Sequence, residues 1–231
     1  YGGPDRSADA LRALPGPAFG RARRGTAQPH ILYIHSWDYD TPIEETMAAL
    51  NDLVRSGKVH YLGASSMHTW QFQQAQHIAE KNGWTKFVVM QNHYSLVYRE
   101  DEREMIPYCK ETGIALVPYA PLAAGRLARE WDADTKRSQE DKSARNKYDK
   151  TEEADRKIVE EVGKVAEKHG TTRAQIALAW LWEKGVVAPI VGVTKEKYLD
   201  DFMGAMDVKL DAEDIDNLEK HYTPHELVGP K

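Results

Sequence analysis

The sequence has little cysteine, no long apolar run and no surplus of positive charge. Its one cysteine, Cys109, excludes an internal disulfide and suits a reducing compartment. No apolar stretch is long enough to cross a bilayer, and no secretory signal is visible. With 31 basic against 36 acidic residues, the chain lacks the basic footprint of nucleic-acid-binding proteins. The composition predicts an acidic, soluble, cytoplasmic protein that has neither a membrane nor a nucleic acid as partner.

The first part of the chain lacks lysine and any strand-like apolar stretch. Residues 1–30 are instead rich in glycine, proline and arginine, and the composition changes abruptly at Ile31. We interpret residues 1–30 as a non-matching segment that is either disordered or the product of a shifted frame or misplaced exon boundary. A natural flexible tail and a basic nucleic-acid arm are the alternatives. Residues 31–231 form the second part of the predicted organisation.

Four strand-like segments recur at a regular spacing. They start at residues 31, 59, 87 and 114, and intervals of about 27 residues suit a strand, a helix and two loops. The strands are apolar runs, as expected when both faces of a sheet are buried. The spacing therefore predicts a parallel α/β sheet. Helices are expected from Thr41 to Gly57 and over residues 72–82, 101–112, 152–169 and 174–184, with a last helix opening at 210–213.

Each of these strands ends in a polar side chain. The carboxyl ends of parallel strands feed the loops that form binding sites. A single polar terminus is more often a satisfied structural group, but four in succession predict one pocket. The combination of an imidazole, hydroxyls, a carboxamide and a phenol suits a planar amide-bearing ring better than a metal, and no His or Cys cluster supports a metal site. The residues are His35, Ser65 with Ser66, Gln91 and Tyr119.

Several motifs, in this order and at this spacing, resemble those of the aldo-keto reductases, which are NADPH-dependent (β/α)8 barrels that reduce aldehydes and ketones. The resemblance covers residues 31–225 and is greatest to fungal and bacterial members near the aryl-alcohol dehydrogenases. It implies an α/β fold of the TIM-barrel type, of which residues 31–231 supply about five of eight strands, the last at Pro189 to Val193. The motifs are I-H-S-W-D around His35, G-K-V-H-Y-L-G-A-S-S through Ser66, the strand ending at Gln91, Y-A-P-L-A-A-G-R-L from Tyr119, and P-I-V-G-V-T-K up to Lys195.

The resemblance implies a role for each strand end. His35 resembles the histidine that hydrogen-bonds the substrate carbonyl, and it is the one catalytic position found. Ser65, Ser66 and Gln91 fall where the family binds the nicotinamide carboxamide. Tyr119 resembles the aromatic residue on which the nicotinamide stacks, with an ordinary buried tyrosine as the alternative.

The resemblance also assigns the phosphates of the cofactor. The loop over residues 121–127 would contact the pyrophosphate, although a plain surface turn is the alternative. Lys195 or Lys197, where a helix opens, would hold the 2′-phosphate, which favours NADP (NADPH) over NAD, and Asp201 would contact adenine. The predicted cofactor-binding residues are Ser65, Ser66, Gln91, Tyr119, Pro121, Leu122, Gly125, Arg126, Leu127, Gly192, Thr194, Lys195, Lys197 and Asp201.

The tyrosine, lysine and aspartate of the family's catalytic tetrad have no counterpart in the matched residues. The tyrosine is needed as a proton donor, and all three belong to strands before His35, for which residues 1–30 are too few. Tyr39 and Tyr94 are the substitutes considered. We therefore expect an NADP-dependent oxidoreductase for small aldehydes or ketones that is catalytically incomplete in this chain. A non-catalytic nucleotide-binding or protein-interaction remnant is the alternative, and open barrel edges favour self-association.

A densely charged stretch over residues 129–150 is poor in aliphatic side chains. This composition predicts a long loop between the strand ending at Tyr119 and the next helix. Because related reductases cover the cofactor with this region, a lid is one interpretation. A loop without such a role is the other.

Overall fold

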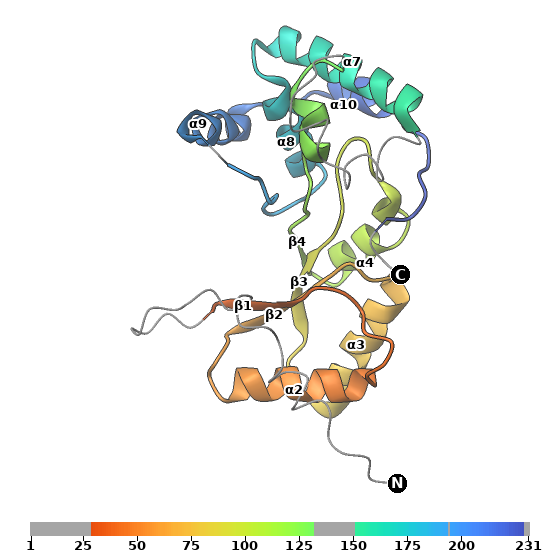
Figure 1. The fold of residues 1–231 in the computed structure, drawn as a ribbon, viewed down its shortest axis with the longest axis vertical. Coiled ribbons are helices and arrows are strands. Elements are labelled where there is room, and N and C mark those ends of the chain that lie inside the picture. The colour runs from red at the N-terminus through yellow and green to blue at the C-terminus, as the bar shows by residue number, and fades with distance from the viewer. Residues whose placement is uncertain (1–28, 132–150, 194, 229–231) are drawn as a thin grey trace. The chain divides into compact units, whose positions relative to one another are not determined.

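The computed structural model describes residues 29–131, 151–193 and 195–228 (Figure 1). They belong to two compact units, and the boundary falls within one strand, between Met90 and Gln91. The predictions made for residues 1–28, for the middle of the charged stretch at 132–150 and for Thr194 lie outside the described residues.

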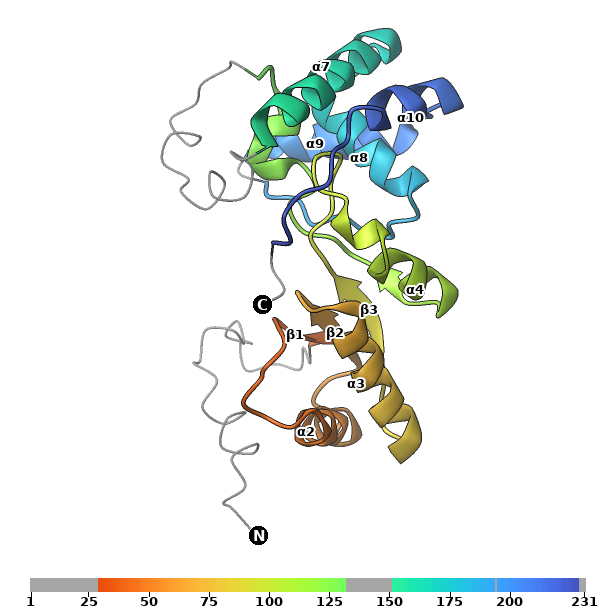
Figure 2. The ribbon, with the colours of Figure 1, turned by 90° about the vertical axis from the view of Figure 1, so that its right-hand side faces the viewer.

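Strands alternate with helices in the first unit, as the spacing predicted. Its elements are β1 (Ile31–Ile34), α2 (Ile43–Arg55), β2 (Tyr61–Ser65), α3 (Thr69–Asn82) and β3 (Phe87–Gln91), whose last residue opens the second unit. β1 and β2 pair in parallel, with Ile31 opposite Tyr61 and Ile34 opposite Ala64. Both helices lie on the same side of these strands in the two views (Figures 1 and 2).

The two helices of the first unit bury one face each. Met47 and Leu50 of α2 and Phe72 and Ala75 of α3 are at most 1 % exposed. The prediction of a helix over 72–82 was short at its amino end, because α3 begins at Thr69. There the side chain of Gln71 accepts the backbone N–H of His68 at 2.8 Å, which satisfies a donor that the first turn leaves open.

The second unit is mainly helical. It contains η1 (Glu100–Glu102), α4 (Met105–Glu111), β4 (Ala115–Leu116), η2 (Ala123–Ala128), α7 (Glu152–His169), α8 (Arg173–Glu183), α9 (Glu196–Gly204), η4 (Ala205–Asp207) and α10 (Ala212–Glu219). The helix predicted over 101–112 begins later than expected, at Met105, so that Pro107 occupies its first turn, where a missing N–H is tolerated. The helix predicted over 152–169 is confirmed with the same bounds.

The core of this unit lies among α7, α8 and α10. Ile158, Val162, Trp180, Leu181 and Leu218 are fully buried there. Gly163 of α7 lies against the guanidinium of Arg173, the first residue of α8. A Cβ on Gly163 would lie 2.3 Å from the guanidinium of Arg173, which instead donates to the carbonyl of Val159. A side chain at position 163 would displace this guanidinium from its hydrogen bond to Val159 O.

Hydrogen-bonded strands follow one another in the order β1-β2-β3-β4. This arrangement confirms the predicted parallel α/β sheet, but the described residues hold four strands and not five. The segment Pro189 to Val193 is not a strand. The chain from Val187 to Ile190 does run beside residues 116–118, since Val187 N–H donates to Leu116 O at 3.0 Å and Ile190 N–H to Pro118 O at 2.9 Å.

Two prolines explain why this pairing stops. Pro118 and Pro189 have no N–H, and each removes one donor from the ladder on its own side. For the same reason β4 ends at Leu116, although the sequence predicted a strand up to Tyr119. Within the fifth predicted strand, Ile190 N–H pairs with Pro118 O, whereas Val187 pairs with Leu116 just before that strand begins.

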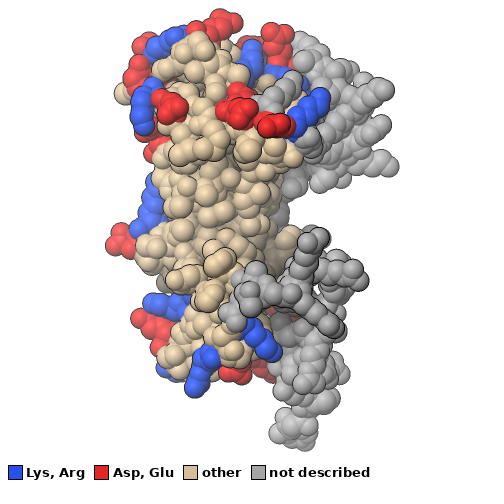
Figure 3. Space-filling model, turned by 90° about the vertical axis from the view of Figure 1, so that its left-hand side faces the viewer, with Lys and Arg blue, Asp and Glu red and all other residues tan. Residues whose placement is uncertain are grey.

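Charged side chains of both signs lie interspersed on the face drawn in Figure 3. Neither sign forms a continuous field there, which agrees with the near balance of basic and acidic residues in the sequence. Within the part of the chain that the structure describes, no helix combines the length and the apolar character needed to cross a membrane.

Candidate active site

The ends of β1 and β2 bring three of the predicted site residues together. The pairing of Ile34 with Ala64 makes His35 and Ser65 the next positions in the register. Ser65 is 2 % exposed, and its Oγ lies 3.2 Å from the Oγ of Ser66. His35 is exposed immediately after β1. An imidazole and two adjacent hydroxyls thus occupy neighbouring strand ends in the first unit.

Ser66 has a backbone conformation that few side chains adopt. Its φ of 46° lies in the left-handed region, which costs a non-glycine residue about 1–3 kcal/mol. The strain turns the chain sharply between β2 and α3. Strained residues of this kind collect at binding sites, where the turn presents the side chain and amide to a ligand.

The same backbone feature recurs after Tyr119, in the second unit. Ala120, Ala123 and Ala124 have φ values of 54°, 47° and 56°, and Gly125 follows at 91°. Among the residues that the structure describes, Ser66 and these alanines are the non-glycine residues with positive φ. Loops in which successive residues visit this region form concave surfaces lined by amides, which bind anions. The loop that resembles the pyrophosphate contact therefore has a backbone that suits a phosphate.

The side chains of this loop divide into buried and partly exposed ones. Pro121 and Leu127 are buried and anchor the loop, whereas Leu122, Gly125 and Arg126 are partly exposed. The guanidinium of Arg126 lies 5.3 Å from the centre of the Trp131 ring. A cation at this distance from an aromatic face is held by the ring's quadrupole.

Gln91 is the last residue of β3, and Tyr119 follows β4. Both are partly buried. The N–H of Tyr119 donates to Asn92 O at 2.8 Å, and Tyr119 forms a parallel bridge with His93. Their rings are stacked, with centres 5.1 Å apart and planes 10° from parallel. His93 is 3 % exposed and was missed from the sequence, although it follows Gln91 at the strand period of two.

The segment around α9 holds the remaining predicted residues. α9 begins directly after the exposed Lys195, and Lys197 lies in its first turn. Gly192 is exposed, and a Cβ added there would meet open space. The carboxylate of Asp201 accepts from Thr172 Oγ at 2.9 Å. That bond ties α9 to the amino end of α8, a structural role that the sequence did not predict.

Comparison with known proteins shows to which family this chain belongs. The model of the Aldo/keto reductase family matches residues 20–223. This chain belongs to the aldo-keto reductase family. The resemblance seen in the sequence is thereby confirmed.

The similar members of the family include several fungal reductases. The chain is 45 % identical over 196 residues to versiconal hemiacetal acetate reductase of Aspergillus parasiticus, covering 84 % of this chain and 57 % of the relative. It is also 45 % identical over 205 residues to a putative aryl-alcohol dehydrogenase of Schizosaccharomyces pombe, with coverages of 86 % and 56 %. The chain thus spans a little over half the length of these curated relatives.

A solved structure supports the fold. The crystal structure of a thermostable aldo-keto reductase in complex with the inhibitor epalrestat matches with a TM-score of 0.66. The match covers 83 % of this chain and 59 % of that chain at 24 % sequence identity. At this identity the likeness concerns the barrel-type fold of the family, which agrees with the α/β fold expected from the strand spacing.

Of the two tyrosines considered as substitute proton donors, Tyr94 has an unfavourable setting. Tyr94 is 1 % exposed and its hydroxyl donates to Glu102. Burial and this hydrogen bond raise the pKa of Tyr94, which makes its phenol a still weaker acid. Tyr39 is 63 % exposed, and its hydroxyl accepts from Gln71 Nε2 at 2.9 Å.

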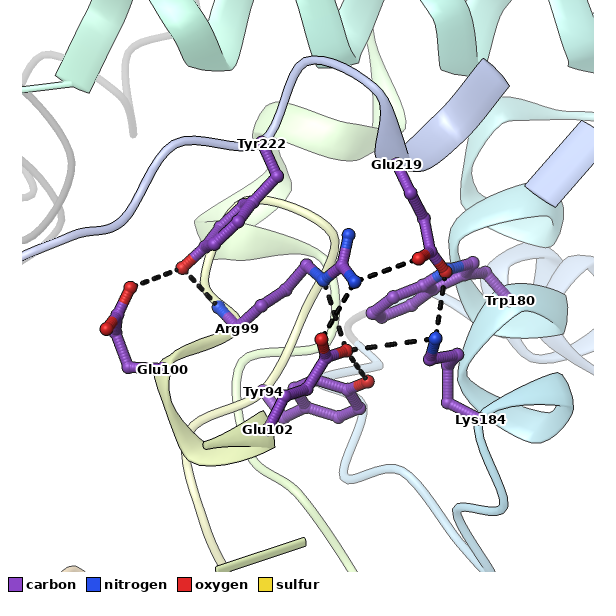
Figure 4. Close-up of polar contacts among 8 residues, drawn as sticks. All are labelled: Tyr94, Arg99, Glu100, Glu102, Trp180, Lys184, Glu219 and Tyr222. Atoms are coloured by element: carbon purple, nitrogen blue, oxygen red, sulfur yellow. Dashed lines mark hydrogen bonds and ion pairs between the residues drawn. The ribbon is translucent and has the colours of Figure 1, made fainter. Parts of the chain in front are cut away.

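Tyr94 belongs instead to a polar network that holds the second unit together (Figure 4). Arg99 donates to Glu102 and, at 2.8 Å, to Glu219. Burial alone would raise the pKa of Glu219, but hydrogen bonds from Trp180 and Lys184 lower it. Figure 4 shows these side chains converging from the segment after β3, from α8 and from the end of α10. The network is structural, and no local sequence pattern predicts it.

Proposed function

We propose that this chain carries the NADPH-binding and carbonyl-orienting residues of an aldo-keto reductase that reduces small aldehydes or ketones. The observation that carries the proposal is the register of β1 and β2, which sets His35 beside Ser65 at adjoining strand ends of a family member. The family uses a nicotinamide cofactor, and the preference for NADP is our inference from Lys195 and Lys197 at the start of α9.

The cofactor would be held by groups of three kinds. The hydroxyls of Ser65 and Ser66 and the side chain of Gln91 would bind the carboxamide, and Tyr119 would stack on the nicotinamide ring. The amides of residues 121–127 would face the pyrophosphate, which the positive φ values of this loop support. Lys195 or Lys197 would face the 2′-phosphate, and Gly192, Thr194 and Asp201 complete the proposed set.

The bound cofactor supplies the hydride that reduces the carbonyl carbon. His35 would donate a hydrogen bond to the carbonyl oxygen and so orient the carbon toward the nicotinamide. The developing alkoxide must also receive a proton, and the burial of Tyr94 argues against that residue as its source. We therefore propose that the chain binds cofactor and substrate but lacks a complete proton-donating set.

A non-catalytic nucleotide-binding or protein-interaction module is the second candidate. The setting of Tyr94 favours it, because binding residues without a proton donor give binding without turnover. Self-association through strand edges would be compatible with either function. We further propose a cytoplasmic location, for which the buried, unpaired thiol of Cys109 is the support.

The test measures NADPH binding by the quenching of tryptophan fluorescence, and NADPH oxidation by the absorbance of the cofactor with an aromatic aldehyde as the acceptor. Wild type, His35→Ala and the control His60→Ala are compared, since His60 is an exposed histidine just before the amino end of β2. Saturable binding with little or no turnover is the expected result. Fast turnover that survives His35→Ala contradicts the proposed role of His35, and absence of NADPH binding contradicts the proposed function.

A further inference from the structure

Three aromatic rings form a continuous stack in the second unit. The ring of His93 lies between those of Tyr98 and Tyr119. Its centre is 4.0 Å from that of Tyr98 and 5.1 Å from that of Tyr119, with planes 14° and 10° from parallel. His93 and Tyr98 are 3 % and 1 % exposed, whereas Tyr119 is only partly buried. The stack therefore runs from the interior toward the ring proposed to contact the nicotinamide.

Backbone pairing produces this stack. Tyr119 and His93 are partners in a parallel bridge, and parallel partners project their side chains to the same side. Four residues form a tight turn directly after His93 and Tyr94. In it Ser95 N–H donates to Tyr98 O at 3.1 Å and Tyr98 N–H to Ser95 O at 3.0 Å. The turn folds Tyr98 back, so that its ring covers His93.

The inner end of the stack is fastened to the last described residues of the chain. The hydroxyl of Tyr98 accepts the N–H of Val228 at 2.9 Å and lies 3.4 Å from its carbonyl oxygen. The ring of Tyr98 is nearly perpendicular to that of His225, with the ring centres 6.2 Å apart. Tyr98 is thus held through both its ring and its hydroxyl, and little freedom is left for the ring of His93 beside it.

We propose that His93 and Tyr98 are positioning residues that fix the plane of the Tyr119 ring for stacking on the nicotinamide of NADPH. The inference rests on the proposed function. An aromatic ring can turn about the bond that joins it to Cβ, and a parallel neighbour restricts this rotation. Because Tyr119 packs on His93, its ring has one orientation toward a ligand. Little conformational entropy of this side chain is then lost when the cofactor binds.

The test compares two ligands by isothermal titration calorimetry on the full chain. NADPH contains the nicotinamide, whereas adenosine 2′,5′-bisphosphate does not. His93→Leu removes the stacking ring and His93→Phe retains one. We expect His93→Leu to weaken NADPH binding by about threefold to tenfold without changing the affinity for the bisphosphate, and His93→Phe to restore most of the loss. Tyr119→Leu should show the same selectivity.

Tyr94→Leu is the matched control, because Tyr94 is the adjacent residue and equally buried but packs on Trp180. It should leave the ratio of the two affinities unchanged. If His93→Leu weakens both ligands equally or neither, while Tyr119→Leu stays selective, the inference is overturned and the proposed function stands. If wild type does not bind NADPH, or Tyr119→Leu shows no selectivity, the proposed contact at Tyr119 fails and the inference fails with it.

Discussion

Replacing Arg99 should destabilise the second unit more than the loss of an exposed ion pair would. The guanidinium meets Glu102 through two hydrogen bonds, of 3.1 and 2.8 Å, and Glu219 through one of 2.8 Å (Figure 4). It also lies 5.6 Å from the centre of the Trp180 ring and 5.1 Å from that of Tyr222. Arg99→Met keeps much of the side-chain volume but leaves both carboxylates without this cation.

The size of the effect follows from the burial of the partners. The Arg99 side chain is 10 % exposed, and those of Glu102 and Glu219 are 27 % and 20 % exposed. Removing one partner of a buried pair costs about 3–5 kcal/mol. Because Lys184 remains 3.0 Å from Glu219, the lower end applies, and we expect a loss of about 3 kcal/mol. For a chain of this length that lowers the melting temperature by about 6–12 °C.

The assay is thermal unfolding followed by circular dichroism. Lys157→Met is the control, because Lys157 is 53 % exposed and its ion pair with Glu153 on α7 is 3.5 Å long. Exposed pairs of this kind contribute little, so the control should melt like the wild type. Equal melting temperatures for Arg99→Met and Lys157→Met would refute the view that the Figure 4 network stabilises the unit.

Two further changes test the packing and the electrostatics of the fold. Gly63→Ala should destabilise by about 1–3 kcal/mol, because the new Cβ would lie 2.5 Å from the Tyr33 ring; Gly192→Ala, whose Cβ meets open space, should be neutral in the same melting assay. Burial raises the pKa of Asp101 to about 6, although a hydrogen bond from Asn92 opposes the rise. The folded protein therefore holds the Asp101 proton more tightly than the unfolded chain does, and stability is lost as pH rises from about 4 to 6. Asp101→Asn should therefore unfold at higher urea than wild type above pH 6, with an advantage that shrinks toward pH 4; an advantage independent of pH would contradict this account.

Local patterns in the sequence predicted most of the fold. The apolar runs predicted at 31 and 87 are strands, the run predicted at 59 is a strand from Tyr61, and the helix predicted over 152–169 is α7. The prediction went wrong where backbone chemistry opposed side-chain pattern. Pro189 to Val193 is apolar enough for a strand, but the prolines at 118 and 189 remove donors from the ladder on both sides.

The candidate site was predictable only where it lies at strand ends. His35 and Ser65 follow from the parallel register, which a regular spacing implies. The stack of His93 on Tyr119 and the ion pair of Arg99 with Glu219 join residues far apart in the sequence, and no periodicity connects such residues. The positive φ values of Ala120, Ala123 and Ala124 were also unforeseen, because alanine carries no signal for that conformation.

The most direct test of the central claim is the affinity of the purified chain for NADPH, measured beside NADH under the same conditions by calorimetry. The account predicts saturable binding of one NADPH per chain, weakened by Ser65→Val, and weaker binding of NADH, which lacks the 2′-phosphate. Equal affinities would contradict the preference inferred from the lysines at the start of α9. Absence of binding to both would contradict the claim that these residues hold a nicotinamide cofactor.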